Sequence, residues 1–260
     1  MNRILITFII CTSYFDVVYA QTDAEKGFEI AKQVDIHDKG WGDSTVNMKM
    51  ILRNKHGEES TRKIRIKVLE VDHDGDKGLI VFDTPKDVKG TAFLSFSHVN
   101  KPDEQWLYLT ALKRVKRLSS SNKSGPFMGS QFAYEDLASF EVDKYEYKYL
   151  NDDVIDGEDA YVIENVPKYK YSGYFRQVTW IHKERYTPLK VDFYDRKNEL
   201  LKTLIFNDYK QYLDKYWRSS KQVMKNIQNG KMTILTMNDY KFRNGFSSQD
   251  FDRNSLKRIR

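Results

Sequence analysis

Along most of the chain, apolar and polar residues alternate at every second position. The alternation runs from Val46 to Leu109 and returns between Tyr145 and Asp239. A period of two is typical of a β-strand whose two faces meet different surroundings. Turn residues separate the runs, and the pair Asn229-Gly230 is a strong signal for a tight hairpin. The pattern therefore predicts an antiparallel meander of about eleven strands.

Helical periodicity is expected in three places. An apolar stripe follows Thr22 as far as about Ile36, a short helix is expected from Tyr134 to Phe140, and another closes the chain within residues 247–259. A sheet with this many strands rarely stays flat, so we expect it to curl without closing. The predicted fold class is mainly β (α+β): a curved antiparallel half-barrel with a few covering helices. The pattern alone fits a filled core and a cavity equally well.

The stretch of residues 105–140 combines a strand, a basic segment and a Ser/Gly-rich connection. Two large apolar residues, Phe127 and Met128, lie in that connection, which runs from Ser119 to Ser130. A linker that only joins two elements has no use for such a pair, so we interpret it as a flap over an apolar surface. Four cations precede the connection: Lys113, Arg114, Lys116 and Arg117.

The order of these segments resembles the bacterial family of outer membrane lipoprotein-sorting proteins. In that family, an aromatic strand leads to a basic segment, a Ser-rich loop, a Phe-Met-Gly-Ser turn and an acidic helix. The matching segments here are Lys113–Leu118, Pro126–Ser130 and Tyr134–Leu137, with further matches at Gly40–Ser44, Trp180–His182 and Pro188–Tyr194. The resemblance spans about residues 38–256.

This resemblance implies a fold like that of LolA and LolB, in which a half-barrel holds lipid acyl chains under its helices. It implies a carrier that binds the acyl chains of a lipid or lipoprotein for transfer toward the outer membrane, beside an inner-membrane exporter of the RND type. Phe127 and Met128 would be its lid. The candidate lining residues are Met48, Met50, Ile66, Val68, Leu94, Phe96, Trp106, Tyr108, Val178, Trp180, Val191 and Phe193.

The basic segment has two interpretations. Lys113, Arg114, Lys116 and Arg117 suit contact with lipid head groups or a partner, and a solvated basic face explains them as well. The whole chain has 43 Lys and Arg against 37 Asp and Glu, a formal net charge of +6. This excess is too small and too mixed to predict a nucleic-acid-binding surface, although transient contact with an anionic membrane surface remains open.

The first twenty residues predict a cleavable signal peptide. Arg3 precedes an apolar run that ends near Ile10, and Ala20 is a small residue at the expected cleavage point. The single cysteine, Cys11, follows Ile10 and not a small residue, which argues against a lipid-anchored N-terminus. We therefore expect residues 21–260 to form one domain in the periplasm of a Gram-negative bacterium.

Catalytic and metal-binding motifs find no support in the sequence. The five histidines lack the spacing of a metal site, and no nucleophile elbow or phosphate-binding glycine loop occurs. The segment Asp72–Gly78 alternates Asp with other residues like a calcium loop, but Lys77 stands where an EF-hand needs Gly. We therefore expect a solvated hairpin turn there, and we predict neither enzyme activity, nor a cofactor, nor a metal.

Two other function classes stay open. A half-barrel of this kind also suits a periplasmic envelope-stress regulator or scaffold that binds a protein segment. An enzyme acting on an envelope glycan or lipid is the third possibility. Co-purifying acyl chains favour the carrier, a peptide-dependent partner favours the regulator, and turnover favours the enzyme.

Overall fold

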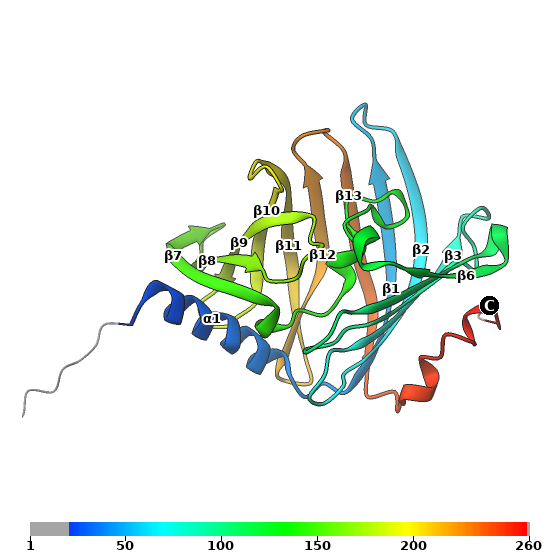
Figure 1. Ribbon diagram of the computed structural model, residues 1–260, viewed down its shortest axis with the longest axis horizontal. Helices are drawn as coiled ribbons and strands as arrows, with labels where there is room; N and C mark the ends of the chain where they lie inside the picture. Colours follow the sequence, from blue (N-terminus) through cyan, green and yellow to red (C-terminus); the bar gives the residue numbers. More distant parts are fainter. Residues whose placement is uncertain (1–20, 259–260) are drawn as a thin grey trace, which may run out of the picture.

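One antiparallel sheet of thirteen strands organises the computed structural model, which describes residues 21–258 (Figure 1). The predicted signal peptide, residues 1–20, lies outside the described residues. The strand order is β6-β5-β4-β3-β2-β1-β13-β12-β11-β10-β9-β8-β7. The strands are β1 (Asp43–Arg53), β2 (Glu59–Leu69), β3 (Lys77–Thr84), β4 (Ala92–Phe96), β5 (Glu104–Leu109), β6 (Arg114–Leu118), β7 (Tyr145–Ile155), β8 (Glu158–Pro167), β9 (Tyr174–His182), β10 (Pro188–Asp195), β11 (Leu200–Tyr212), β12 (Tyr216–Asn226) and β13 (Met232–Phe242).

The predicted fold class is confirmed: the sheet curves around an inner face and does not close (Figure 1). It has more strands than expected, because the basic segment Arg114–Leu118 pairs with β5 as strand β6. The helical content of the described residues is lower than expected. One α-helix, α1 (Asp23–Asp38), is accompanied by short 3-10 turns. These are η1 (Thr110–Leu112), η2 (Ser120–Asn122), η3 (Phe127–Gly129), η4 (Tyr134–Leu137), η5 (Val142–Lys144), η6 (Ser248–Asp250) and η7 (Leu256–Arg258).

The two expected short helices are thus 3-10 turns, because their apolar residues serve other contacts. At residues 134–140 the regular turn stops at Leu137, and Ala138 is extended. The C-terminal segment forms two separate turns that place Phe251 and Leu256 against the sheet. Isolated turns of this length gain little from helix cooperativity, so tertiary packing decides their shape.

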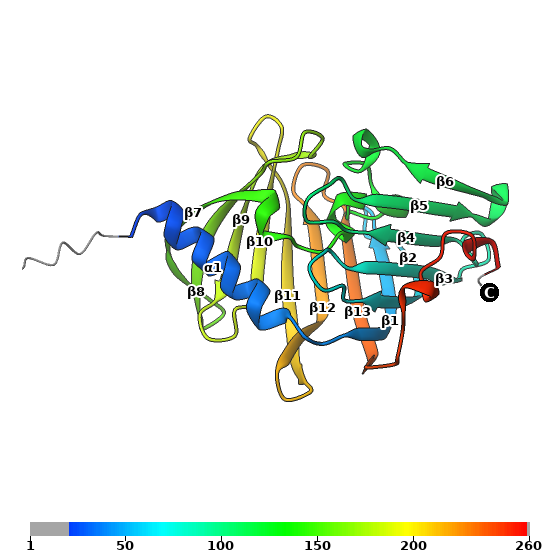
Figure 2. The same cartoon turned by 60° about the horizontal axis from the view of Figure 1, so that its bottom comes forward.

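Helix α1 begins with a capping box. The Thr22 hydroxyl accepts a hydrogen bond from the Glu25 amide at 3.2 Å, and the Glu25 carboxylate accepts one from the Thr22 amide at 2.9 Å. The helix packs mainly on the inner face of β7, which is an edge strand (Figure 2). Gly27 permits this close approach, since a Cβ atom there would lie 2.7 Å from the Tyr149 amide nitrogen. Ile30 and Ala31 are then buried against Tyr147 and Ile163.

The connection between β6 and β7 spans the sheet from one edge to the other. We call residues 119–144 the crossing segment. It lies on the inner face, where Phe127 is fully buried and packs on Phe82 and Phe93 with ring centroids 5.8 and 5.4 Å apart. The inner face of the central strands completes this core. Met48, for example, stands opposite Ile64 on β2 and Met237 on β13.

Strands β3 to β5 are apolar on both faces, because the C-terminal segment covers their outer face (Figure 2). Phe251 is 2 % exposed and Leu256 is fully buried in this second cluster. The uninterrupted apolar run Leu79–Phe82 reflects this arrangement. Leu79 and Val81 pack against the C-terminal segment on the outer face, whereas Ile80 and Phe82 lie on the inner face with the crossing segment.

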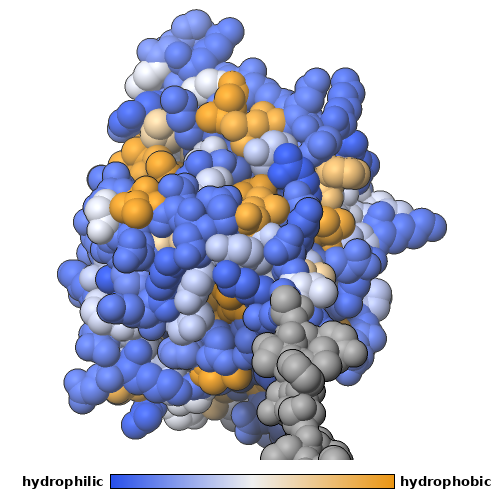
Figure 3. Space-filling model, turned by 90° about the vertical axis from the view of Figure 1, so that its left-hand side faces the viewer, coloured by the Kyte–Doolittle hydropathy of each residue, from blue (hydrophilic) through white to orange (hydrophobic). Residues whose placement is uncertain are grey.

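The face at the α1 and β7 end is mainly hydrophilic, with separate hydrophobic patches (Figure 3). Exposed apolar residues in this half of the protein include Phe28 of α1, Leu150 and Val154 of β7, and Phe175 of β9. Scattered residues of this kind are normal on a protein surface. Within residues 21–258, no helix is both long enough and apolar enough to span a membrane.

Candidate functional site

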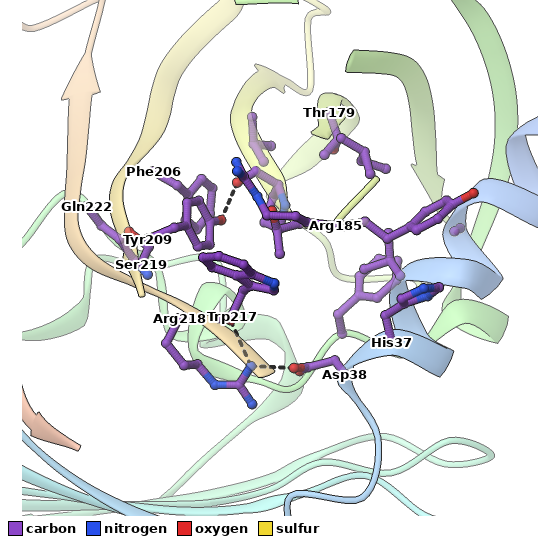
Figure 4. A pocket seen from close by; sticks show the side chains of 18 of the residues that line it. His37, Asp38, Thr179, Arg185, Phe206, Tyr209, Trp217, Arg218, Ser219 and Gln222 are labelled. Atoms are coloured by element: carbon purple, nitrogen blue, oxygen red, sulfur yellow. Dashed lines mark hydrogen bonds and ion pairs between the residues drawn. The ribbon is translucent and has the colours of Figure 1, made fainter. Parts of the chain in front are cut away.

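A cavity of about 470 Å³ lies between α1 and the inner face of strands β8 to β12 (Figure 4). It exists because α1 and the crossing segment cover different parts of the sheet. The first half of α1 packs on β7, and Phe127 of the crossing segment fills the space over β3 and β4. The volume falls within the usual range of small-molecule pockets.

The wall of the cavity is largely apolar. Its apolar residues come from α1, the crossing segment and several strands, and each strand contributes positions of its inner face. They include Ala31 and Val34 of α1, Ile163 of β8, Ile181 of β9, Val191 of β10 and Phe206 of β11. A methylene group is about as large as a water molecule, whose share of liquid volume is about 30 Å³, so the cavity has room for roughly fifteen methylene groups.

Arg185 dominates the polar part of the wall. It belongs to the turn between β9 and β10, and its guanidinium group lies over the rings of Tyr209 and Trp217, 5.6 and 5.3 Å from their centroids (Figure 4). Its Nη2 pairs with Glu158. Glu158 also accepts a hydrogen bond from His182 Nε2 at 2.8 Å, because His182 Nδ1 accepts from the Glu184 and Arg185 amides and leaves the proton on Nε2. Burial and the neighbouring Arg185 lower the pKa of His182.

A second arginine closes the cavity near the end of α1. Arg218 pairs with Asp38 and also donates to the Trp217 carbonyl at 3.0 Å (Figure 4). Burial raises the pKa of Asp38, and Arg218 opposes that increase. The His37 ring stacks on Tyr186 with centroids 4.6 Å apart, so α1 is also held to the β9–β10 turn.

The crossing segment is tied to the sheet by buried polar contacts. Asp136 forms an ion pair with Lys202 of β11 at 2.6 Å, with side chains 7 % and 4 % exposed, and accepts a hydrogen bond from Tyr174 at 2.7 Å. Glu135 accepts hydrogen bonds from the Gly173 amide at 2.8 Å and from Ser172 at 3.0 Å. Burial nevertheless raises the pKa of Glu135. These contacts fix this part of the crossing segment to strands β9 and β11.

A second cavity, of about 410 Å³, lies where the β4–β5 connection, the crossing segment and the β8–β9 connection meet. Two of its lysines, Lys123 and Lys144, share the Asp103 side chain, which lies 3.8 and 2.5 Å from their ammonium groups. Because Lys123 also donates to the Asp103 carbonyl at 2.6 Å, both lysines have partners within the protein. The first cavity is therefore the better candidate site.

The structure divides the twelve predicted lining residues between the two faces of the sheet. The inner face carries six of them. Of these six, Val191 lines the cavity, and the other five belong to or neighbour the core over the central strands. The inner residues are Met48, Met50, Ile66, Val68, Val191 and Phe193.

The other six lie on the outer face, away from the cavity. Four of them, Leu94, Phe96, Trp106 and Tyr108, pack with the C-terminal segment, and Trp180 donates a hydrogen bond to Asp153 at 2.8 Å. Val178 shares the face of Trp180 by alternation. Alternation by itself does not say which face of a strand is the inner one.

The predicted lid and basic segment also lie elsewhere than at the cavity. Phe127 is a core residue, and Met128 is half-buried beside it, with its carbonyl bound by Arg62. The basic residues Lys113, Arg114, Lys116 and Arg117 are all exposed along or next to edge strand β6, and none of them lines the cavity. Exposed charges on an edge strand hinder pairing with another chain.

The polar wall residues Arg185, Tyr209 and Trp217 were not singled out from the sequence. Arg185 belongs to a turn that carries no motif, and Tyr209 and Trp217 lie on strands β11 and β12, where no motif marks them as cavity residues. Among residues 21–258, no group of three His, Cys, Asp or Glu side chains is arranged to hold a metal ion. Residues 72–76 form the turn that leads into β3, which begins at Lys77.

Comparisons with known proteins agree on one relationship. A protein-family model described as "Uncharacterized protein" matches residues 74–258, and no curated protein matches significantly. A crystal structure from Vibrio parahaemolyticus, described as an outer membrane lipoprotein-sorting protein domain, is 58 % identical, with a TM-score of 0.88 over 90 % of this chain and 99 % of that one. A DUF1329 family protein from Desulfovibrio piger is 30 % identical, with a TM-score of 0.86 over 90 % of this chain and 99 % of that one.

A more distant relative shows the fold alone. A LolA superfamily protein from Nitrosomonas europaea is 21 % identical, with a TM-score of 0.69 over 87 % of this chain and 97 % of that one. The sequence resemblance is thus confirmed on independent grounds. The chain belongs to the family of the outer membrane lipoprotein-sorting protein domain and has a LolA-like fold.

Proposed function

We propose that the protein is a periplasmic carrier that holds one acyl chain of a lipid or lipoprotein in the cavity beneath α1. The observation that carries this proposal is a cavity of about 470 Å³ with an apolar wall in a half-barrel of the LolA type. The relationship to an outer membrane lipoprotein-sorting protein domain supports the cargo class and the periplasmic location. Binding, and not bond chemistry, is then the function.

The size of the cavity sets the energy of binding. Each buried methylene group contributes about 0.8 kcal/mol, so a chain that fills the roughly fifteen available places gains about 12 kcal/mol before the cost of ordering it. Affinities in the micromolar to nanomolar range correspond to about 8 to 12 kcal/mol. One chain can therefore be held without any covalent step.

Exchange of the cargo requires one cover of the cavity to move. Helix α1 is the simpler candidate, because it packs mainly on one edge strand and its end is held by the Asp38–Arg218 pair and the His37–Tyr186 stack. Movement of the crossing segment, with Phe127 and Met128 as a lid, would also break the buried Asp136–Lys202 pair. Transfer beside an RND-type exporter, and transient contact with a membrane surface, belong to this proposal through the family resemblance.

Two measurements test the carrier. Native mass spectrometry of the mature chain from a periplasmic extract, with lipid extraction of the same sample, is expected to show a bound species of lipid mass. Replacement of Val34 by Trp is expected to fill part of the cavity and weaken displacement of Nile red by palmitate at least tenfold. The control is Val154→Trp, at a position that is 59 % exposed on β7. An empty protein that binds neither Nile red nor palmitate would refute the carrier.

A further inference from the structure

We propose that the cavity selects a single-chain lipid with an anionic head group, whose carboxylate or phosphate binds Arg185. The proposal rests on the proposed function, because it takes the acyl chain to lie along the apolar wall. It adds a substrate class, since a neutral acyl chain has no use for a guanidinium group at this position.

Arg185 has more hydrogen-bond donors than partners. A guanidinium group carries five N–H donors. Among the described residues, Glu158 binds this group, through its Nη2 atom. The Nε atom is buried without a hydrogen-bond partner, although the side chain forms part of the cavity wall. A buried donor of a charged group without an acceptor is destabilising. An anionic ligand in the cavity would remove this deficit after a small rotation of the side chain.

Two other arginines show that the deficit is particular to Arg185. Arg176 has nearly the same side-chain exposure, 20 % against 21 %, and also lies over an aromatic ring, that of Tyr194. Its Nε donates to Asn198 at 2.8 Å and its Nη1 pairs with Glu164 at 3.3 Å. Arg218, at the other end of the cavity, is bound by Asp38 and the Trp217 carbonyl.

The charges around the cavity leave room for an added anion. The wall includes the cations Lys215 and Arg218 in addition to Arg185, and the carboxylates Asp38 and Glu184. Glu158 lies outside the wall, is 40 % exposed at its side chain and is shared with His182. Its charge is therefore divided and partly solvated, so it neutralises Arg185 incompletely.

The position of Arg185 also matches an amphiphile. Its guanidinium lies over Tyr209 and Trp217, whereas Val34 of α1 and Ile163 of β8 belong to the apolar part of the wall. An acidic group at Arg185 takes part of the roughly fifteen places in the cavity, and the remaining places hold most of one long acyl chain. An arginine that already lies over two rings loses little further freedom on binding, and its fork suits carboxylate and phosphate.

The test compares two lipids with the same chain and different charge. Displacement of the neutral dye Nile red is measured for 1-palmitoyl lysophosphatidic acid and for monopalmitoylglycerol, which lacks the phosphate. We expect the anionic lipid to bind about tenfold more tightly to the native protein. Arg185→Gln should remove this preference and leave monopalmitoylglycerol unaffected, whereas the matched control Arg176→Gln should retain it. Palmitate distinguishes carboxylate from phosphate, and inorganic phosphate alone should displace no dye.

Each outcome decides between the two proposals. Equal binding of both lipids, unchanged in Arg185→Gln, refutes the head-group selection and leaves the acyl-chain carrier intact. Absence of binding by either lipid refutes both. If Arg185→Gln fails to fold, Arg185→Lys keeps the charge without the fork and should lose several-fold of the preference. The comparison of the two lipids on the native protein needs no variant.

Discussion

Replacing Gly27 by Ala separates two opposite expectations about helix α1. Ala has a higher helix propensity than Gly, so in an isolated helix the change stabilises by about 1 kcal/mol. In the folded protein, the added Cβ would lie 2.7 Å from the Tyr149 amide nitrogen and 2.8 and 3.0 Å from main-chain atoms of Lys148. Main-chain atoms of a paired strand cannot rotate away, so the helix has to move outward.

The magnitude follows from these distances. Overpacking typically costs 1–3 kcal/mol, and contact with a backbone favours the upper end, about 3 kcal/mol. After the gain of about 1 kcal/mol from propensity, we expect a net loss of about 2 kcal/mol. For a protein of this size, 1 kcal/mol shifts the Tm by about 2–4 °C, so the expected decrease is about 4–8 °C. The outward shift should also widen the cavity, since Ala31 and Val34 of α1 are part of its wall.

Thermal unfolding followed by circular dichroism measures the change. The exposed residue Lys32 of α1 supplies the control, because the difference between Lys32→Ala and Lys32→Gly reports the propensity difference without a steric contact. That difference should be about 1 kcal/mol in favour of Ala. A Gly27→Ala protein at least as stable as the native one would refute the close approach of α1 to β7.

Two further predictions concern buried charges. Lys202→Met leaves Asp136 buried without its cation, and we expect the free energy of unfolding, measured in urea, to fall by about 3–5 kcal/mol. The double variant Lys202→Met with Asp136→Asn should recover part of this loss. A double variant no more stable than the single one would contradict the prediction. Burial, with Glu141 nearby, raises the pKa of Asp76 to about 7. The folded state then binds more protons than the unfolded state between about pH 4 and 7, so stability should fall as the pH rises through this window, by at least about 1.4 kcal/mol. Asp76→Asn should remove this decrease in stability with rising pH. Denaturant titrations at several pH values measure it, and the same pH dependence in Asp76→Asn as in the native protein would contradict the prediction.

The sheet was predictable because its signal is repeated in every strand. A period of two along Val46–Leu52 and again along Ile64–Val68 requires no knowledge of partners, and hairpin turns fix the neighbours. Strand β6 was not predicted as a strand, because three of its five residues are Arg or Lys and were interpreted as a basic patch. A charged edge strand has little apolar signal, since solvent covers one of its faces.

The candidate site was less predictable than the fold. Trp106 and Leu94 have the same alternation as Met48 and Met50. The first pair nevertheless lies on the outer face, under the C-terminal segment, and the second pair lies on the inner face. Which face is inner depends on contacts between distant parts of the chain, and no local pattern records them. Arg185 was not predicted for the same reason: the aromatic rings beneath its guanidinium group, those of Tyr209 and Trp217, come from strands β11 and β12.

The pairing of β1 with β13 affects how the protein folds. Strands β1 to β6 and β7 to β13 are two meanders with local contacts, but the seam between them, in the middle of the sheet, joins the first strand of the chain to the last. Contacts between residues so distant in sequence form slowly, because a long loop has to close first. During export, β1 therefore has an open edge until the last strands arrive, and such an edge can pair with another chain. A holding chaperone in the receiving compartment would protect this intermediate.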